Sequence, residues 1–312
     1  MRKHLASALV AAAALIFGPA AQADPLPLRV GWVVCPPELT PVLLAPPGVV
    51  RHLGKSYTFE PVHFQGTPAM ITATASGDLR VIFSEFEDGV PGYFTEPYVV
   101  LKSSGIDKVE DLKGKVVATN AIGSGVDIAM RAMLKKHGLE DKRDYSVVEI
   151  AFPNMKAALL ENKVSLITTT VLNANDPELM DKAKILFTEK DAVGESQFAL
   201  WTARASFIKA HRAALVDFME DSLRALHWYL DPKNHAQAVA LVAAFTKRPP
   251  ALFTGWLLTH NDQYRNSNGL PNVAALQRNL DTAQQLGFIN TRLDASKYLD
   301  LSLVKEAAAR LK

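Results

Sequence analysis

The sequence predicts a mixed α/β protein with two lobes and a helical C-terminal region, and three observations support this fold class. Short apolar runs alternate with amphipathic segments from about residue 28 to residue 187, which is typical of a mostly parallel sheet covered by helices. From Ser206 onward the chain carries helical patterns only. With 312 residues, of which 48% are hydrophobic, it is long enough for two lobes that each bury a core.

The first lobe is expected to begin with two strands and a helix. Its predicted elements are strands over residues 28–34, 57–64 and 80–86, a helix over 67–77 and an extended segment over 98–101. Thr67-Pro68 is a capping residue followed by proline, a common helix start, and Gly77 supplies the stop. Met70, Ile71 and Ala75 are spaced to form the buried face of this helix.

The second lobe continues the alternation of strand and helix. Strands are predicted at 116–118, 145–150, 164–168 and 185–187, with helices at 127–137 and 154–161. After an extended connection at 198–202, helices are predicted at 206–229, 235–245, 273–286 and 301–311. These patterns predict lobe 1 over 24–103, lobe 2 over 104–197, and a return to lobe 1 with C-terminal helices over 198–312.

The N-terminus has the pattern of a secretory signal peptide over residues 1–23. Two basic residues precede an apolar stretch at 5–17 that is too short to cross a bilayer. Ala21-Gln22-Ala23 has the small-x-small form of a cleavage site, so the mature chain is expected to start at Asp24. No cysteine stands directly after this site, and we therefore expect a soluble protein exported to the periplasm without a lipid anchor.

Charge and cysteine content exclude several function classes. The formal net charge is +2 with both signs interspersed, so the sequence offers no basic stripe for nucleic acid. Cys35 is the single cysteine, which rules out a disulfide within the chain and a cysteine-rich metal cluster. We expect it to pack as a small apolar residue, with a place beside a ligand as the alternative. The eight histidines form no metal-binding pair in sequence, so neither metal nor cofactor is predicted.

A glycine-hinged segment in the second lobe is the most informative local pattern. The apolar run 116–118 reads as a strand, and Gly123 and Gly125 let the backbone approach a ligand before a helix begins. A helix start presents unpaired N–H groups and a partial positive charge, which suit a polar or anionic ligand. The alternative is a strand-to-helix turn in which these residues only cap the helix.

Several of these features together resemble a known family. They are the signal peptide, the strand at 28–34, Asp111-Leu112-Lys113-Gly114-Lys115, the helix start Gly123-Ser124-Gly125 and the helical C-terminus. The chain resembles the periplasmic substrate-binding proteins of ABC importers in the nitrate, sulfonate and taurine group, which are related to thiamine-precursor binders. The resemblance implies a type II periplasmic-binding fold, a monomer without enzymatic activity, and two lobes that close on a solute before docking on a membrane permease.

The resemblance also implies where the solute lies. In such proteins it is held by loops at the carboxyl ends of strands and by helix starts. The corresponding positions are Trp32, Gln65, Gly66, Thr67, Asn120, Gly123, Ser124, Gly125, Asn154 and Thr169. Trp32 has packing in the core as its alternative role, and Asn120 and Ser124 have capping of their own helix. Because two helix starts, at Thr67 and Ser124, are expected to face one cleft, a small polar or anionic solute is predicted.

One departure from the family concerns the first lobe after Leu79. In the family, a sequence such as Gly77-Asp78-Leu79 leads into a strand, a ligand-facing loop and another helix before a strand like the one at 80–86. Here Leu79 runs directly into Arg80. About 25 to 30 residues, the normal length of such a unit, are therefore missing, and the first lobe is expected to be shortened.

Two other functions compete with solute capture for an importer. The resemblance extends to enzymes of the thiamine-pyrimidine synthase type, which have the same fold. Those enzymes are intracellular and cysteine-rich, whereas this chain has a predicted signal peptide and one cysteine. Glu85 and Glu87 alternate along one strand face, which is more often solvated than catalytic. A receptor that presents its closed form to a membrane sensor is the second alternative, and the residues do not distinguish it from an importer component.

Overall fold

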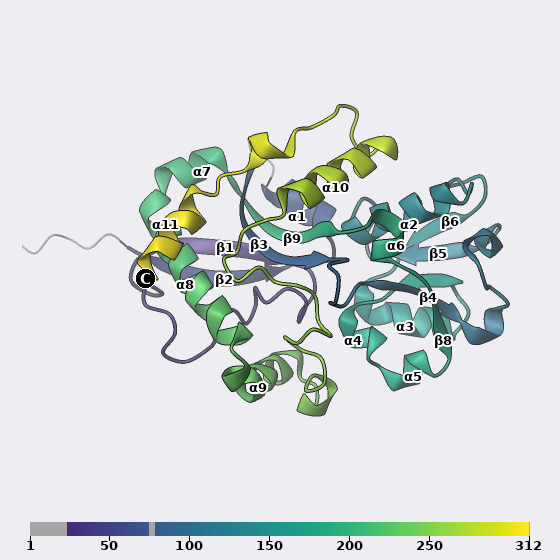
Figure 1. Cartoon of the computed structure of the whole chain (residues 1–312), viewed down its shortest axis with the longest axis horizontal. Helices are drawn as coiled ribbons and strands as arrows, with labels where there is room; N and C mark the ends of the chain where they lie inside the picture. The colour runs from purple at the N-terminus through teal and green to yellow at the C-terminus, as the bar shows by residue number, and fades with distance from the viewer. Residues whose placement is uncertain (1–23, 75–78, 312) are drawn as a thin grey trace, which may run out of the picture.

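The computed structural model describes residues 24–74 and 79–311, which form two lobes side by side (Figure 1). The predicted signal peptide, residues 75–78 and residue 312 lie outside the described residues. The predicted two-lobed α/β architecture is confirmed, and most predicted elements are present within one to four residues of their expected ends. Within the described ranges, none of the helices has the length and apolar character that a membrane crossing requires.

The second lobe is built on a five-stranded mixed sheet with strand order β6-β5-β7-β4-β8. Its strands are β4 (Pro97–Leu101), β5 (Val116–Thr119), β6 (Ser146–Glu149), β7 (Leu166–Thr168) and β8 (Ala183–Thr188). The central strand β5 is parallel to β6 and β7, whereas β4 is antiparallel to β7 and β8. Apart from Val116 at the start of β5, the apolar residues of β4, β5 and β7 are buried on both faces, as expected for strands covered by helices on each side.

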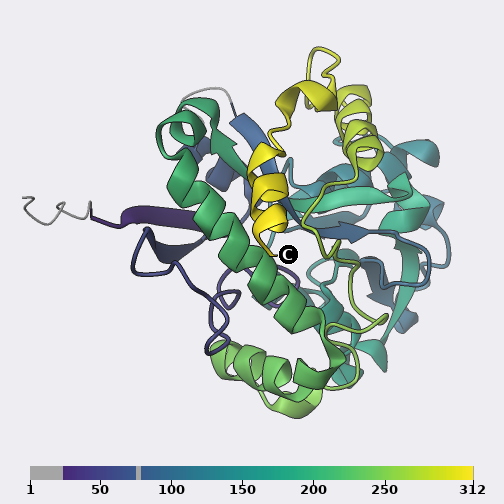
Figure 2. The same cartoon turned by 60° about the vertical axis from the view of Figure 1, so that its left-hand side comes forward.

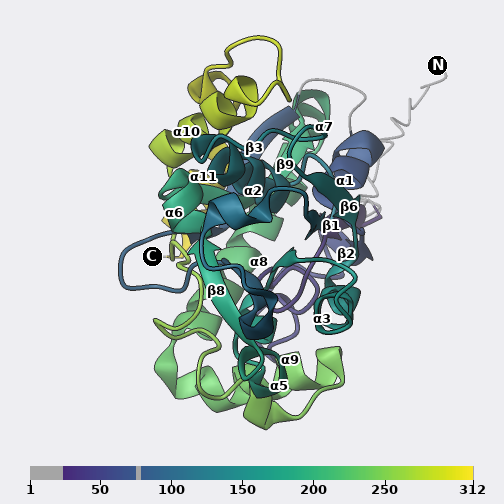
Figure 3. The same ribbon diagram turned by 90° about the vertical axis from the view of Figure 1, so that its right-hand side faces the viewer.

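Helices cover both faces of this sheet. They are α2 (Gly125–Lys136), α3 (Phe152–Leu160), α4 (Val171–Ala174), α5 (Pro177–Met180) and α6 (Glu189–Val193). In Figure 3, α2 and α6 lie above the sheet and α3 and α5 below it. Two separate apolar cores result: Met130 and Leu134 of α2 pack in one, and Met155 and Leu159 of α3 in the other. The short helices α4, α5 and α6 are too brief to produce a periodic sequence signal.

The first lobe contains two separate two-stranded sheets. Its strands are β1 (Leu26–Trp32), β2 (Tyr57–His63), β3 (Leu79–Asp88) and β9 (Ser196–Arg204). β1 pairs in parallel with β2, and β3 pairs antiparallel with β9. In the described part of the chain no strand joins β1 to β9, so this lobe lacks the continuous sheet of its partner. This interruption agrees with a lobe shortened after Leu79.

The helix α1 (Thr67–Thr74) departs from the prediction in its burial. Met70 is only half-buried and Ile71 is 49% exposed, so the predicted face is not buried at these two residues. Ala75 lies outside the described residues. A helix buries its apolar stripe only where a sheet surface lies beneath it, and here the interrupted sheet offers little such surface.

Helices of six to 19 residues complete the first lobe. They are α7 (Ala205–Ala210), α8 (Arg212–Leu230), α9 (His235–Thr246), α10 (Val273–Gln285) and α11 (Ser302–Arg310). Short 3-10 turns cover Lys102–Ser104, Val109–Leu112, Pro232–Asn234, Pro250–Leu252 and Ala295–Tyr298. Figure 2 shows α11 lying along α8. Phe218 of α8 stacks on Trp201 of β9 with ring centroids 5.2 Å apart, which ties this helix to the β3-β9 pair.

The change of lobe occurs earlier in the chain than residue 103. β4, at Pro97–Leu101, lies in the sheet of the second lobe between β7 and β8. Tyr98 of β4 is fully buried there and stacks on Phe187 of β8 with centroids 4.5 Å apart. Strand order depends on pairing between distant segments, which the local apolar pattern of β4 does not contain.

Candidate functional site

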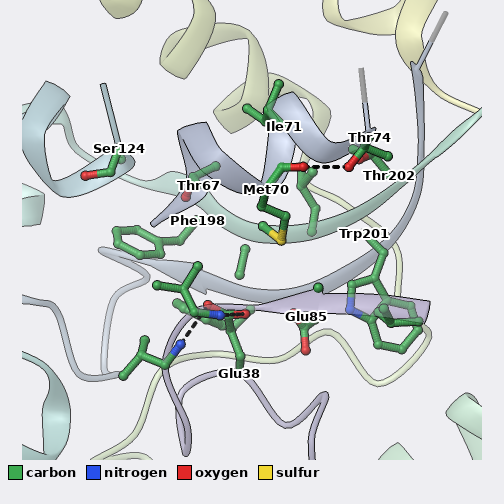
Figure 4. A pocket seen from close by; sticks show the side chains of 18 of the residues that line it. Glu38, Thr67, Met70, Ile71, Thr74, Glu85, Ser124, Phe198, Trp201 and Thr202 are labelled. Atoms are coloured by element: carbon green, nitrogen blue, oxygen red, sulfur yellow. Dashed lines mark hydrogen bonds between the residues drawn. The ribbon is translucent and has the colours of Figure 1, made fainter. Parts of the chain in front are cut away.

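A cavity of about 280 Å³ lies where the two lobes meet, with walls from both (Figure 4). The first lobe contributes β1, α1, β3 and β9, and the second contributes the loop 120–126, Phe152 and Thr170. In Figure 4, Met70 and Ile71 of α1 lie on one side and Glu38 and Glu85 on the opposite side. Its size is close to the lower end of the range for small-molecule sites, roughly 300 to 1,000 Å³.

The glycine-hinged segment forms part of this wall and also caps α2. The Ser124 hydroxyl donates to Asn120 Oδ1 at 2.8 Å and accepts from the backbone N–H of Asp127 at 3.4 Å. The Asp127 carboxylate accepts from the backbone N–H of Gly123 at 2.8 Å and pairs with Arg131 at 2.9 Å. A carboxylate of the chain therefore already occupies this helix start, which leaves less of its positive potential for a bound anion.

The two predicted loops meet across the gap between the lobes. A methyl group placed on Gly66 would lie 2.5 Å from Ala121 Cβ and 3.4 Å from Asn120 Nδ2. Atoms at 2.5 Å overlap, so only glycine permits this approach of the first lobe to the second. The structure thus holds the lobes in contact at Gly66.

The cavity brings together part of the predicted set. Thr67, Asn120, Ser124 and Gly125 line it. Six other predicted residues lie outside its wall: Trp32, Gln65, Gly66, Gly123, Asn154 and Thr169.

The residues outside the wall have other contacts. Trp32 packs on His63, with ring centroids 4.5 Å apart, and on Phe245 at 5.7 Å. Thr169 is buried, and its hydroxyl donates to the Pro97 carbonyl at 3.3 Å. Asn154 is exposed on α3. The wall instead contains neighbours of two of these positions, Phe152 and Thr170.

Three buried glutamates outside the predicted set also line the cavity. Glu38 follows β1, Glu85 lies in β3 and Glu96 precedes β4; their exposed fractions are 9%, 8% and 3%. Glu38 Oε2 accepts from the Val33 N–H at 3.0 Å, and Glu85 Oε1 accepts from the Thr40 hydroxyl at 2.6 Å. Alternation along β3 is a poor guide here, because this strand is covered on both faces and even Glu87 is buried.

Burial is the largest cause of the raised pKa of these three carboxyls. It raises the pKa of Glu85 to about 7, against the opposing effects of hydrogen bonds from Thr40 and the charge of Arg265. Burial, together with the Glu85 charge, raises the pKa of Glu38 well above its usual range. Glu96 is shifted in the same direction by burial and by the charges of Asp88 and Glu189. Perturbed carboxyls that converge on a cavity mark it as a candidate binding site.

Cys35 is half-buried and packs against the apolar core of the first lobe, near these acids. Burial raises the pKa of its thiol, and the charges of Glu38 and Glu85 raise it further. A thiol in this environment stays protonated at neutral pH and is a poor nucleophile. This supports its predicted role as a small apolar residue.

A second group of ionisable side chains lies away from the cavity, around α8. Single ligand atoms of His52, Asp217 and Glu220 lie within 4.8 Å of one another, a set that could suit a metal ion. Arg310 pairs with Asp217 at 2.8 Å, and Arg224 pairs with Glu220 at 2.8 Å. These arginines already supply positive charge, so the group reads as an ion-pair network.

Comparison with known proteins supports the fold. Residues 93–236 match a family model described as NMT1/THI5 like. The chain matches none of the curated protein sequences.

Several solved structures resemble the whole chain. The alkanesulfonate-binding protein SsuA of Xanthomonas axonopodis pv. citri, bound to MOPS, is 19% identical with a TM-score of 0.67, covering 89% of this chain and 99% of that one. The periplasmic nitrate-binding protein NrtA of Synechocystis is 12% identical with a TM-score of 0.72, covering 92% and 89%. The desulfurization enzyme DszB is 14% identical with a TM-score of 0.64, covering 93% and 100%.

At these identities the solved structures bear on architecture, and they include both binding proteins and an enzyme. The likeness extends over about nine-tenths of the chain. The protein has the type II periplasmic-binding fold, and its residues 93–236 carry the sequence pattern of the NMT1/THI5-like family.

Proposed function

We propose that this protein is the solute-binding component of an ABC importer, which captures a small polar solute between its lobes and delivers it to a permease in the inner membrane. The observation that carries this proposal is a cavity of about 280 Å³ with walls from both lobes. The names of SsuA and NrtA, and of a "Ligand Binding Component of ABC-type Import System" from Staphylococcus aureus with a TM-score of 0.67 and 14% identity, support the same role. Export through the predicted leader, with cleavage after Ala23, would place the protein in the periplasm.

Capture would work through closure of the lobes. The chain crosses between lobes twice, once between β3 and β4 and once between α6 and β9. A solute shifts the open-to-closed equilibrium only by the contacts that it makes better in the closed form. Thr67 on the first lobe and Asn120 and Ser124 on the second are placed to make such contacts.

Covalent catalysis through Cys35 is disfavoured, because burial holds its thiol protonated. Capture for a membrane sensor would use the same event. A permease and an ATPase encoded beside the gene would support import, whereas a membrane kinase there would support sensing.

Isothermal titration of the refolded, solute-free protein tests the proposal. The panel is nitrate, alkanesulfonates, taurine, pyrimidines and primary amines, with thermal unfolding measured in parallel. At a solute concentration of about 100 Kd, binding adds about 2.7 kcal/mol to the free energy of unfolding. A folded protein that gives neither heat nor a thermal shift with every member of the panel would count against a solute-binding role and in favour of an impaired, truncated lobe.

Asn120 provides the matched mutational test. Its side chain lines the cavity and is 7% exposed. We expect Asn120→Ala to weaken the binding of a solute from the panel by about 1 to 3 kcal/mol, because a buried hydrogen bond is lost. Asn154→Ala, on an exposed residue outside the cavity wall, should leave the affinity unchanged. Equal affinities for both variants would remove Asn120 from the site.

A further inference from the structure

The cavity occupies the interruption in the sheet of the first lobe. Residues 28–31 of β1 and 198–203 of β9 both line it, and in the described residues each strand pairs on one side only. Neighbouring strands of a sheet lie about 4.8 Å apart, so a strand missing between two others leaves a gap of about 10 Å. The cavity is therefore a slot that runs beside two open strand edges.

The walls of this slot are mainly apolar. Met70 and Ile71 of α1 line one side, and Leu215 and Phe218 of α8 line another. The 49% exposure of Ile71 shows that α1 lacks cover where the sheet is interrupted. An apolar group in the slot would bury this surface, and burial of apolar area is the main source of affinity in such sites.

Glu96 contributes a buried polar group to the wall of the slot. This residue is 3% exposed, and its Oε1 accepts from Gln263 Nε2 at 2.9 Å. Its Oε2 is buried and has no hydrogen-bond partner among the described residues. A buried acceptor without a donor is destabilising, so this atom favours a ligand that supplies an N–H or O–H group.

The charges near Glu96 also favour a donor or a cation. The negative charges of Asp88, Glu189 and Asp262 act on Glu96, and Glu85 and Glu38 line the same cavity. Arg265 donates to Asp262 at 3.0 Å and to the Pro37 carbonyl at 2.7 Å, so its positive charge is already paired within the protein.

Among the described residues, the cavity wall includes one cation, Arg29, whose side chain is 67% exposed and pairs with Glu60. The described part of the buried wall therefore carries carboxyls without a free positive charge. This composition disfavours a sulfonate or nitrate head.

We propose that the cavity selects an amphipathic amine: a protonated amino head placed against Glu96, with Glu85 and Glu38 nearby, and an extended apolar body in the slot between β1 and β9. This inference rests on the proposed solute-binding function and specifies its substrate class. It replaces the anionic solute that the two helix starts suggest, because Asp127 already occupies the start of α2.

Matched ligands test the head and the body separately. The refolded protein is titrated with hexylamine, ethylamine and hexane-1-sulfonate. Hexylamine and ethylamine share the amino group and differ in chain length, whereas hexylamine and hexane-1-sulfonate share the hexyl chain and differ in charge. We expect hexylamine to bind about tenfold or more tightly than either of the others, since the longer chain buries more apolar surface and the ammonium group supplies donors to Glu96.

Two variants locate the ligand. Glu96→Gln should weaken hexylamine binding about tenfold or more, whereas Glu161→Gln, on a 56% exposed side chain of the second lobe, should not change it. Ala199→Phe, which places a ring in the cavity wall, should remove the preference for hexylamine over ethylamine. Circular dichroism and thermal unfolding establish that each variant is folded.

The outcomes separate this inference from the proposed function. Binding of a sulfonate, nitrate, taurine or a pyrimidine without binding of amines would overturn the amine proposal and leave the solute-binding role intact. Hexylamine binding that is insensitive to chain length or to Glu96→Gln would also overturn it. A folded protein that binds nothing in the panel would overturn both.

Discussion

At the scale of single residues, buried acids set the character of the site. Glu38, Glu85 and Glu96 come from three separate segments and meet on one cavity wall. Each is held away from water, and desolvation shifts all three toward the protonated form. A hydrogen-bond donor or cation that enters the cavity would therefore stabilise the ionised form of these carboxyls.

The variant Glu85→Gln should reveal the cost of ionising this acid. The pKa of this carboxyl is 4.5 in the unfolded chain, and burial raises it to about 7 in the folded protein. Between these values the native state binds more protons, so the Glu85 contribution to the free energy of unfolding falls as pH rises. Glutamine keeps the acceptor for Thr40 and carries no charge.

We therefore expect Glu85→Gln to gain stability over the wild-type protein from pH 5 to pH 8, by roughly 3 kcal/mol for a shift of this size. Urea unfolding of the ligand-free protein at several pH values measures the difference. Glu161→Gln serves as the exposed control and should show a flat difference. A pH-independent difference for Glu85→Gln would mean that Glu85 does not titrate in this window.

At the scale of secondary structure, the two lobes differ in how their strands are supported. In the described residues β5 pairs on both sides, with β6 and β7, and lies in a five-stranded sheet. β1 and β9 each belong to a two-stranded sheet, and isolated strand pairs are marginally stable. The packing of α8 against Trp201 compensates for part of this loss.

Hydrogen exchange should report this difference directly. We expect the amides of β1 and β9 to exchange at least about tenfold faster than those of β5, because strand edges beside a cavity open through smaller fluctuations. Exchange followed by mass spectrometry on peptides covering 26–32, 196–204 and 116–119 measures the rates. Equal protection of the three segments would show that the first lobe is as well supported as the second.

At the scale of the whole molecule, function depends on how closely the lobes approach. The contact of Gly66 with Ala121 and Asn120 allows this approach, and a side chain at position 66 would obstruct it. A protein whose binding-competent closed form is less populated has a proportionally weaker apparent affinity.

Gly66→Ala tests this dependence on closure. We expect it to weaken solute binding about tenfold or more and to increase the radius of gyration measured by small-angle X-ray scattering, while the folding of each lobe is retained. Gly255→Ala is the matched control, since a methyl group there meets no atom within 4 Å. Unchanged affinity and dimensions in Gly66→Ala would show that this contact does not limit closure.

Residues close together in the chain are enough to predict much of this molecule. Apolar alternation, capping residues and glycine stops predict most strands and helices, and the family pattern predicts the two lobes and four lining residues, Thr67, Asn120, Ser124 and Gly125. The jump from Leu79 to Arg80 predicts a shortened first lobe.

Other features depend on contacts between distant segments. The place of β4 in the second sheet, the exposure of α1 and the meeting of Glu38, Glu85 and Glu96 have no local signature. Glu85 shows why: its spacing along β3 suggests a solvated face, yet the strand is covered on both sides. Secondary structure follows from interactions over a few residues, whereas strand order, burial and the charge of a cavity follow from which segments pack together in space.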